Sequence, residues 1–127
     1  MVSWNNLDTL ASFKELADVK PACLTEVMSG DNGADRVKKY SVPMAAGLSY
    51  NYASKQVDED VLSALEKLAD EAQLADKFKA LYNGEVVNTG EKRLVLHHMT
   101  RGQLGDAVEA DGVDKRTFYK TQQERIA

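Results

Sequence analysis

The chain has 127 residues, of which 43% are hydrophobic and 28% are charged, and its net charge is −4. This length suits one domain, and the acidic balance without a dense basic run excludes a general attraction to nucleic acid or to anionic lipid. A single cysteine rules out an internal disulfide, and the charged first 20 residues and the lack of a long apolar run exclude a signal peptide and a membrane span, so we expect a cytoplasmic protein.

The first third of the chain is predicted to be helical. Apolar residues at three- and four-residue spacing predict a helix over residues 5–17, with Asn5 or Asn6 as its cap. A second short helix begins near Pro21 and ends at Ser29-Gly30. A brief helical segment is predicted near residues 34–38.

Cys23 falls on the inward face predicted for the second helix, together with Leu24 and Val27. No histidine or basic cluster lies beside it in the sequence to activate the thiol. We therefore expect a buried and inert thiol.

The pattern changes from a helical period to alternation between residues 40 and 52. Two strands are predicted, with residues 45–47 as the loop between them and Pro43 at an edge because it lacks an amide donor. The alternating apolar residues are Tyr40, Val42, Met44, Leu48, Tyr50 and Tyr52. Tyr50 and Tyr52 fall on one strand face, where we expect them to belong to the core.

Two helices are predicted next, over residues 59–73 and 74–82. Asp58 stands at the N-cap position of the first, and Glu59 and Asp60 suit the positive end of its dipole. The second ends at the turn Asn83-Gly84. The core-facing residues predicted for the pair are Val61, Leu62, Leu65, Leu68, Ala69, Ala72, Leu74, Phe78 and Leu81.

Residues 84–101 carry the most distinctive pattern. Asn88 stands where a helix N-cap belongs, and its side-chain oxygen can accept from the amide of Glu91, which can reach back in turn. A two-faced helix over residues 93–101 is predicted. Its apolar face holds Val95, Leu96 and Met99, and its polar edge holds Arg93, His97 and Arg101.

After this helix, glycines at 102, 105 and 112 indicate a loop-rich stretch, and residues 113–127 are predicted to be helical, with Phe118, Tyr119 and Ile126 as apolar points. No Gly, Asn or Pro stop signal follows this last helix. We expect a chain of this kind to be part of a larger protein.

The polar edge of Arg93, His97 and Arg101 has two interpretations. Three potential cations on one helix face can hold a phosphate or a carboxylate. They can also pair with the chain's 20 acidic residues, which we favour because surface ion pairs are common.

Other candidate chemistry is weaker. His97 and His98 are adjacent, so on a helix they point about 100° apart and do not suit one metal ion. The sequence contains no Gly-rich phosphate loop and no Gly-x-Ser-x-Gly elbow. We therefore predict no catalytic, cofactor-binding or metal-binding residue within the chain.

The pattern Gly-Glu-x-x-Asn-x-x-Glu-x-Arg-x-Val-Leu-His-x-x-x-Arg resembles a segment in the N-terminal part of the glucose-6-phosphate isomerase family. The matching residues are Gly84, Glu85, Asn88, Glu91, Arg93, Val95, Leu96, His97 and Arg101, and the departures are Val86, Gly90, Leu94, Met99 and Thr100. Tyr52-Ala53-Ser54-Lys55 is similar to a phrase that follows the second strand of a strand pair in that family.

The resemblance implies a fold class and a role. Residues 1–127 are expected to form a single N-terminal segment, mainly α with a small two-stranded hairpin (α+β), of a larger α/β sugar-isomerase enzyme. Family members interconvert glucose 6-phosphate and fructose 6-phosphate through a cis-enediol, with a glutamate as base and with no metal or other cofactor. The catalytic residues would lie beyond Ala127, so the chain alone is expected to be inactive.

The same resemblance implies the partners. These are the remaining sugar-isomerase domains and, for the whole enzyme, a sugar phosphate and a second copy in a homodimer, with no nucleic acid and no membrane. Two alternatives stay open. One is a stand-alone helical interaction module, and the other is a small phosphate-binding regulator that uses Arg93, His97 and Arg101.

Overall fold

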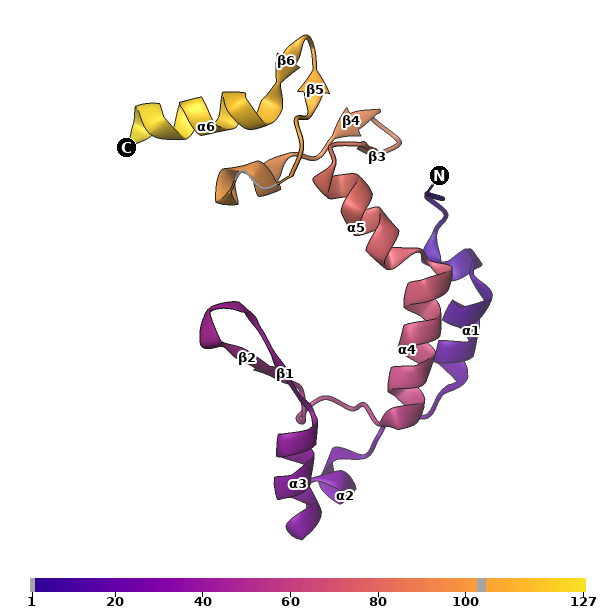
Figure 1. Ribbon diagram of the computed structural model, residues 1–127. Helices are drawn as coiled ribbons and strands as arrows, with labels where there is room; N and C mark the ends of the chain where they lie inside the picture. Colours follow the sequence, from indigo (N-terminus) through magenta and orange to yellow (C-terminus); the bar gives the residue numbers. More distant parts are fainter. Residues whose placement is uncertain (1, 103–104) are drawn as a thin grey trace. The chain divides into compact units, whose positions relative to one another are not determined.

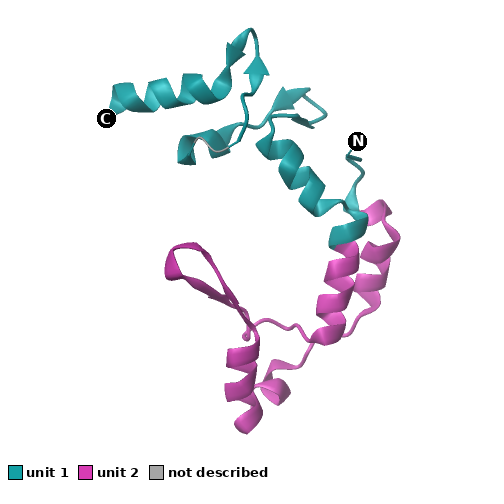
Figure 2. Cartoon of the chain, viewed as in Figure 1, with its two compact units in different colours: residues 1–7, 69–127 teal, residues 8–68 magenta. Residues whose placement is uncertain are grey.

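The computed structural model describes residues 2–102 and 105–127 and divides into two compact units. Unit 1 comprises residues 1–7 and 69–127, and unit 2 comprises residues 8–68 (Figure 2). Helices with short antiparallel strand pairs make up both units, so the expected mainly helical α+β class is confirmed (Figure 1). The described residues form three two-stranded hairpins, where the sequence predicts one.

The first helices of the chain are shorter than predicted. A 3-10 turn covers Leu7–Thr9, and α1 begins only at Ala11 and runs to Asp18. The predicted start at residue 5 and the cap at Asn5 or Asn6 are therefore wrong. Leu10 has an extended backbone that interrupts the helical path, and its side chain forms no capping hydrogen bond.

The second helix is also shorter, and this changes the environment of Cys23. α2 covers Leu24–Val27, with Cys23 in an extended conformation just before it. The Cys23 side chain is exposed, whereas the neighbouring Ala22 is buried. The prediction of a buried thiol is wrong because a single helical turn has no broad inward face.

The predicted strand pair is present. β1 (Ser41–Pro43) pairs antiparallel with β2 (Ser49–Asn51), and Val42 lies opposite Tyr50. A 3-10 turn at Ala45–Gly47 joins the strands, as the sequence predicts for the loop. Pro43 needs no ladder donor because every strand of a two-stranded sheet is an edge.

The tyrosines of this hairpin are placed differently from the prediction. Tyr50 is 50% exposed and stacks on Tyr52 at 6.0 Å between ring centroids, so it is not a core residue in this structure. Tyr40 is buried and meets Tyr52 edge to face. Alternation predicts which residues share a face, but burial needs a covering layer, which a lone hairpin lacks.

A buried arginine organises unit 2. Arg36 lies in α3 (Asp31–Lys39), and its guanidinium donates to three carbonyls of the segment that follows the hairpin. The acceptors are Ala53, Lys55 and Val57, at 2.8, 3.0 and 2.6 Å. The guanidinium also lies over the Tyr40 ring, 4.2 Å from its centroid.

The helix predicted over residues 59–73 is α4 (Glu59–Glu71), and its cap is as predicted. The Val61 amide donates to the Asp58 carboxylate at 3.0 Å. Only part of the predicted apolar stripe is covered, because Val61 and Ala72 are buried while Leu65 is 40% exposed.

Helix α4 also carries an exposed ion pair near its start. The Lys39 ammonium lies 2.8 Å from the Glu59 carboxylate. The hydrogen bond between them raises the pKa of Lys39 and, together with the Tyr40 hydroxyl, lowers the pKa of Glu59. Both side chains are more than 60% exposed, so we expect this pair to contribute little to stability.

In unit 1, α5 (Leu74–Tyr82) is confirmed, but the helix predicted over residues 93–101 is wrong. The chain instead forms a hairpin of β3 (Val86–Asn88) and β4 (Arg93–Leu94), followed by a 3-10 turn at His97–Arg101. The Glu91 amide donates to the Asn88 side-chain oxygen at 3.1 Å, as a capping bond would. That bond closes a turn here, with Lys92 in the left-handed conformation.

The C-terminal part of unit 1 adds a hairpin that the sequence prediction missed. β5 (Glu109–Ala110) pairs with β6 (Val113–Asp114) through a tight turn in which Asp111 and Gly112 both have positive φ. The predicted last helix is α6 (Lys115–Ile126). Asp114 caps it by accepting from the amides of Arg116 and Thr117.

Candidate functional site

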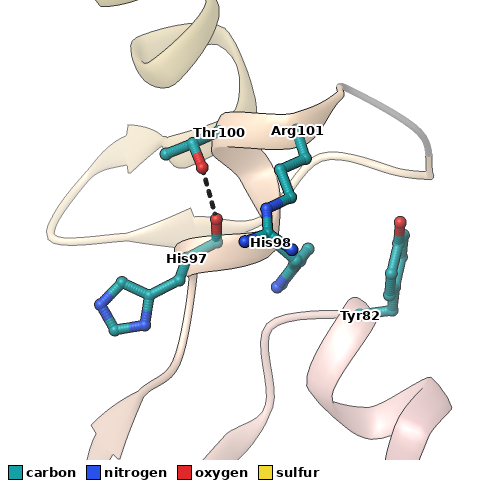
Figure 3. A pocket seen from close by; sticks show the side chains of 5 residues that line it. All are labelled: Tyr82, His97, His98, Thr100 and Arg101. Carbon is teal, nitrogen blue, oxygen red and sulfur yellow. Dashed lines mark hydrogen bonds between the residues drawn. The ribbon is translucent and has the colours of Figure 1, made fainter.

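A cavity of about 440 Å³ lies in unit 1 beside the 3-10 turn that follows β4. Its lining consists of Tyr82, His97, His98, Thr100 and Arg101, and we call it the histidine pocket (Figure 3). Tyr82 comes from the end of α5, and the other four come from the 3-10 turn. Two imidazoles and a guanidinium therefore line one cavity, and none of its lining residues is acidic.

The 3-10 turn is held in place from two sides. Met99 is fully buried and is the largest such side chain among the described residues. The Thr100 hydroxyl donates to the His97 carbonyl at 2.8 Å, and the side-chain Nε2 of Gln123 donates to the Thr100 carbonyl at 2.6 Å. In Figure 3 the His97 ring is turned away from the Tyr82, His98 and Arg101 side chains.

His98 is the most constrained group in the pocket. Its ring stacks on Tyr82 with 4.7 Å between centroids and 27° between planes. Both ring nitrogens are buried and have no hydrogen-bond partner among the residues that the structure describes. A buried polar group without a partner costs on the order of 1–3 kcal/mol, so the burial of this ring lowers the stability of unit 1.

A second buried arginine holds Tyr82, which lines the histidine pocket, in position. Arg116 of α6 donates to the Tyr82 carbonyl at 2.5 Å and to the Asp106 carbonyl. Its guanidinium carbon also lies 6.0 Å from the centre of the Tyr82 ring. Sequence reasoning missed both Arg116 and its counterpart Arg36, because nothing in helical periodicity marks an arginine as buried.

The three cations predicted to share a helix edge are divided by the structure. His97 and Arg101 line the histidine pocket, but Arg93 lies on β4 with its guanidinium 3.8 Å from the Glu91 carboxylate. The favoured pairing with acidic residues is thus confirmed for Arg93. No hydrogen bond or ion pair joins the Arg101 side chain to any other described residue. The cavity is lined by His98, which was not predicted to share a face with His97 and Arg101, and not by Arg93.

In the view of Figure 3, the His97 and Tyr82 side chains lie on opposite sides of His98. Within residues 2–102 and 105–127, no group of three or more His, Cys, Asp and Glu side chains has the geometry to hold a metal ion. The Arg101 guanidinium supplies hydrogen-bond donors and a fixed positive charge to the wall of this cavity.

No helix of the described residues is long and apolar enough to cross a bilayer.

Comparison with known proteins identifies relatives of the chain. Residues 51–127 match the family model described as phosphoglucose isomerase. The glucose-6-phosphate isomerase of Treponema denticola is 42% identical over 130 residues, which cover 98% of this chain and 25% of the relative. The isomerase of Borreliella afzelii is 41% identical over 99% of this chain and 23% of the relative. That of Pseudomonas aeruginosa is 40% identical over 63% of this chain and 14% of the relative. The chain thus spans about a quarter of the length of the curated relatives that it matches most fully.

Proposed function

The chain belongs to the phosphoglucose isomerase family, and from this premise we propose that it forms the N-terminal segment of a glucose-6-phosphate isomerase. The supporting observation is that nearly the whole chain aligns with such enzymes while covering only a quarter of their length. The proposed activity of the whole protein is the interconversion of glucose 6-phosphate and fructose 6-phosphate. Its proposed compartment is the cytoplasm, and the proposed assembly is a homodimer.

We expect the chemistry to be carried by residues outside this chain. A proton transfer between C2 and C1 through a cis-enediol needs a base whose pKa lies near the operating pH. It also needs fixed donors or cations beside the enediolate oxygen. Those groups would belong to the sugar-isomerase domains beyond Ala127, and residues 1–127 would act together as one supporting segment.

Exposed apolar side chains support the scaffold role. On α5, Leu74 and Phe78 are 60% and 61% exposed, and together with Trp4 and Val87 they line one apolar groove. In unit 2, Tyr50 and Leu65 line another. Contiguous apolar surface of this kind is unusual on a free monomer, and its proposed occupant is the remaining three-quarters of the same polypeptide.

A chimera tests the proposal. The stretch of the Treponema denticola enzyme that aligns with this chain would be replaced by residues 1–127, and glucose 6-phosphate isomerisation would be measured in a coupled assay. We expect the chimera to be active and the same enzyme with that stretch deleted to be inactive. A folded chimera without activity would contradict the proposed role.

The isolated chain provides the complementary measurement. We expect no turnover of glucose 6-phosphate by the purified 127 residues at any concentration used for the chimera. Turnover by the isolated chain would show that catalytic groups lie within it, and the scaffold role would then be wrong.

A further inference from the structure

We propose that Ser3 and Trp4 form a strap that maintains the break between helices α4 and α5. The break falls at Ala72 and Gln73, and the N-terminal end of the chain lies beside this junction (Figure 1). Without the strap, we expect residues 69–82 to form one continuous helix. The proposal concerns unit 1 alone and does not depend on the isomerase assignment, so the two can fail separately.

No residue type between positions 69 and 82 interrupts a helix. The stretch contains neither glycine nor proline, and most of its residues are strong helix formers such as alanine, leucine, lysine, glutamate and glutamine. The predicted boundary between the two helices follows from the spacing of apolar residues and not from a residue that ends a helix.

The break depends on a residue in an unfavourable conformation. Gln73 is left-handed, with φ of 55° and ψ of 40°, immediately before α5. A residue with a Cβ atom keeps this conformation only where surrounding contacts impose it. The amides of Leu74, Ala75 and Asp76 then fall in the first turn of α5, where an amide has no intrahelical acceptor. A continuous helix would remove both costs.

The strap supplies contacts that stabilise the break. The Ser3 backbone amide donates to the Gln73 side-chain oxygen at 2.8 Å, across 70 positions of sequence. The Trp4 ring centre lies 5.6 Å from the Lys77 ammonium, and Trp4 lines an apolar groove with Phe78. These contacts form on the backbone as the break places it, so they favour the broken form over the continuous helix.

The strap also connects the N-terminus to the groove on α5 that is proposed to receive the rest of the polypeptide. Trp4 forms one wall of that groove. Release of the strap removes this wall, so the break and the groove depend on the same contacts. Capture of the N-terminal residues by another molecule would therefore change the helix and the groove together.

Hydrogen exchange of single amides tests the strap. In the full 127-residue chain, NMR would follow the amides of Leu74, Ala75 and Asp76, which gain helical acceptors only when the break is lost. Ser3→Pro removes the donor amide, whereas Ser3→Ala keeps it and is the matched control. We expect exchange about tenfold slower in Ser3→Pro, the order of protection that one hydrogen bond gives, and unchanged exchange in Ser3→Ala.

Two further substitutions separate the strap from the conformation that it imposes. Trp4→Ala should slow the same three amides, as Ser3→Pro does. Gln73→Gly should not slow them, alone or combined with Ser3→Pro, because glycine adopts the left-handed conformation without steric cost. The strong NOE between the amide and α protons of Gln73, which marks a positive φ, should be lost in Ser3→Pro and Trp4→Ala.

The exchange rates decide the outcome. Protected amides in α6 would show that the rest of unit 1 remains folded in each variant. Slower exchange in both Ser3→Pro and Trp4→Ala, but not in Ser3→Ala, would support the strap. Exchange that is unchanged or faster in either strap variant, equally slow in Ser3→Ala, or still slowed when Gln73→Gly is present would overturn the proposal.

Discussion

At the scale of single residues, two buried arginines hold together segments that apolar side chains would hold together in a larger core. Arg36 joins three carbonyls of residues 53–57 to α3, and Arg116 joins the carbonyls of Tyr82 and Asp106 to α6. Each guanidinium also lies against a tyrosine ring. Because a guanidinium keeps its charge and carries five donors, it can satisfy several buried carbonyls at once.

We predict that Arg116→Lys destabilises unit 1 by about 1.5–3 kcal/mol, the contribution of one hydrogen bond to a charged group. Lysine keeps the charge but cannot donate to the Tyr82 and Asp106 carbonyls from one planar group. Urea unfolding followed by the fluorescence of Trp4, the only tryptophan and a residue of unit 1, would measure the change. The matched control is Arg125→Lys at an exposed position of the same helix, and equal stability of the two variants would contradict the clamp role of Arg116.

Gly84 is a second residue whose identity follows from its surroundings. Its φ is +72°, and a Cβ at this position would collide with the side chain of the buried Val108. Gly112 has the same φ of +72°, but a Cβ there would meet no atom within 4 Å.

The two glycines allow backbone strain and steric overlap to be separated. We predict that Gly84→Ala is more destabilising than Gly112→Ala by about 1–3 kcal/mol, the usual cost of forcing extra volume into a packed site. Both variants carry the same left-handed backbone cost, so the difference reports the contact with Val108. Thermal unfolding of the two variants would measure it, and matching losses would show that backbone conformation alone selects glycine at position 84.

At the scale of elements, short polar bonds decide where helices and turns begin. The side-chain oxygen of Asn88 accepts from the Glu91 amide in a hairpin turn, and Asp114 accepts from two amides at the start of α6. The same kind of bond thus serves two geometries, depending on whether the following residues continue a helix. Lys92 is left-handed and so directs the chain into β4.

The cap at Asp114 predicts a pH dependence. The Thr117 hydroxyl and the amides of Val108, Arg116 and Thr117 donate to this carboxylate and hold its pKa below the ordinary value of 3.8. A lowered pKa in the folded state stabilises the fold above the unfolded-state pKa, and this contribution is lost as the pH falls through the folded-state value. We therefore predict that the stability gap between the unchanged chain and Asp114→Asn is full above pH 4 and shrinks at more acidic pH.

Urea unfolding at neutral pH and at two or three pH values below 4 would measure that gap. Asp76→Asn is the matched control, since Asp76 forms an exposed pair with Lys79 on α5. Its gap from the unchanged chain should be small across the same range. A gap for Asp114→Asn that stays constant down to the most acidic pH would contradict the role assigned to the ionised cap.

At the scale of the whole molecule, the described residues leave much of their apolar surface uncovered. Met99 is the only large side chain among them that is fully buried, while many leucines, valines and aromatic residues are more than a third exposed. Apolar burial is the main favourable term in folding, so a chain with so little of it gains stability when further surface is covered. This pattern suits a segment that packs against additional polypeptide.

We predict that Phe78→Ser lowers binding of the apolar dye ANS and self-association of the isolated chain. It should also cost about 0.5–1.5 kcal/mol of stability, because the contact between the Phe78 and Tyr82 rings, 5.6 Å apart at their centroids, is lost. Phe78 is 61% exposed and lines the groove with Trp4 and Leu74, so its removal breaks a contiguous apolar patch. Dye fluorescence and analytical ultracentrifugation would measure both effects. Ile126→Ser, at an 86% exposed position near the end of α6, should change neither, because a single exposed apolar residue is ordinary.

Local chemistry let the sequence alone determine several features of this protein. The cap at Asp58, the hairpin at residues 40–52, the helices near 59–71 and 74–82 and the family all follow from residues close together in the chain. Periodicity and capping involve residues within one or two turns of each other, so the local sequence is sufficient to predict these helices, strands and caps.

Tertiary structure decided the rest. It turned the expected helix at 93–101 into a hairpin and a 3-10 turn, exposed Cys23 and buried Arg36 and Arg116. It also removed Arg93 from the candidate site and brought Tyr82 and His98 together. Burial and pocket membership depend on groups that are distant in sequence, such as Tyr82 and Arg116, which are 34 positions apart, and no local pattern contains that information.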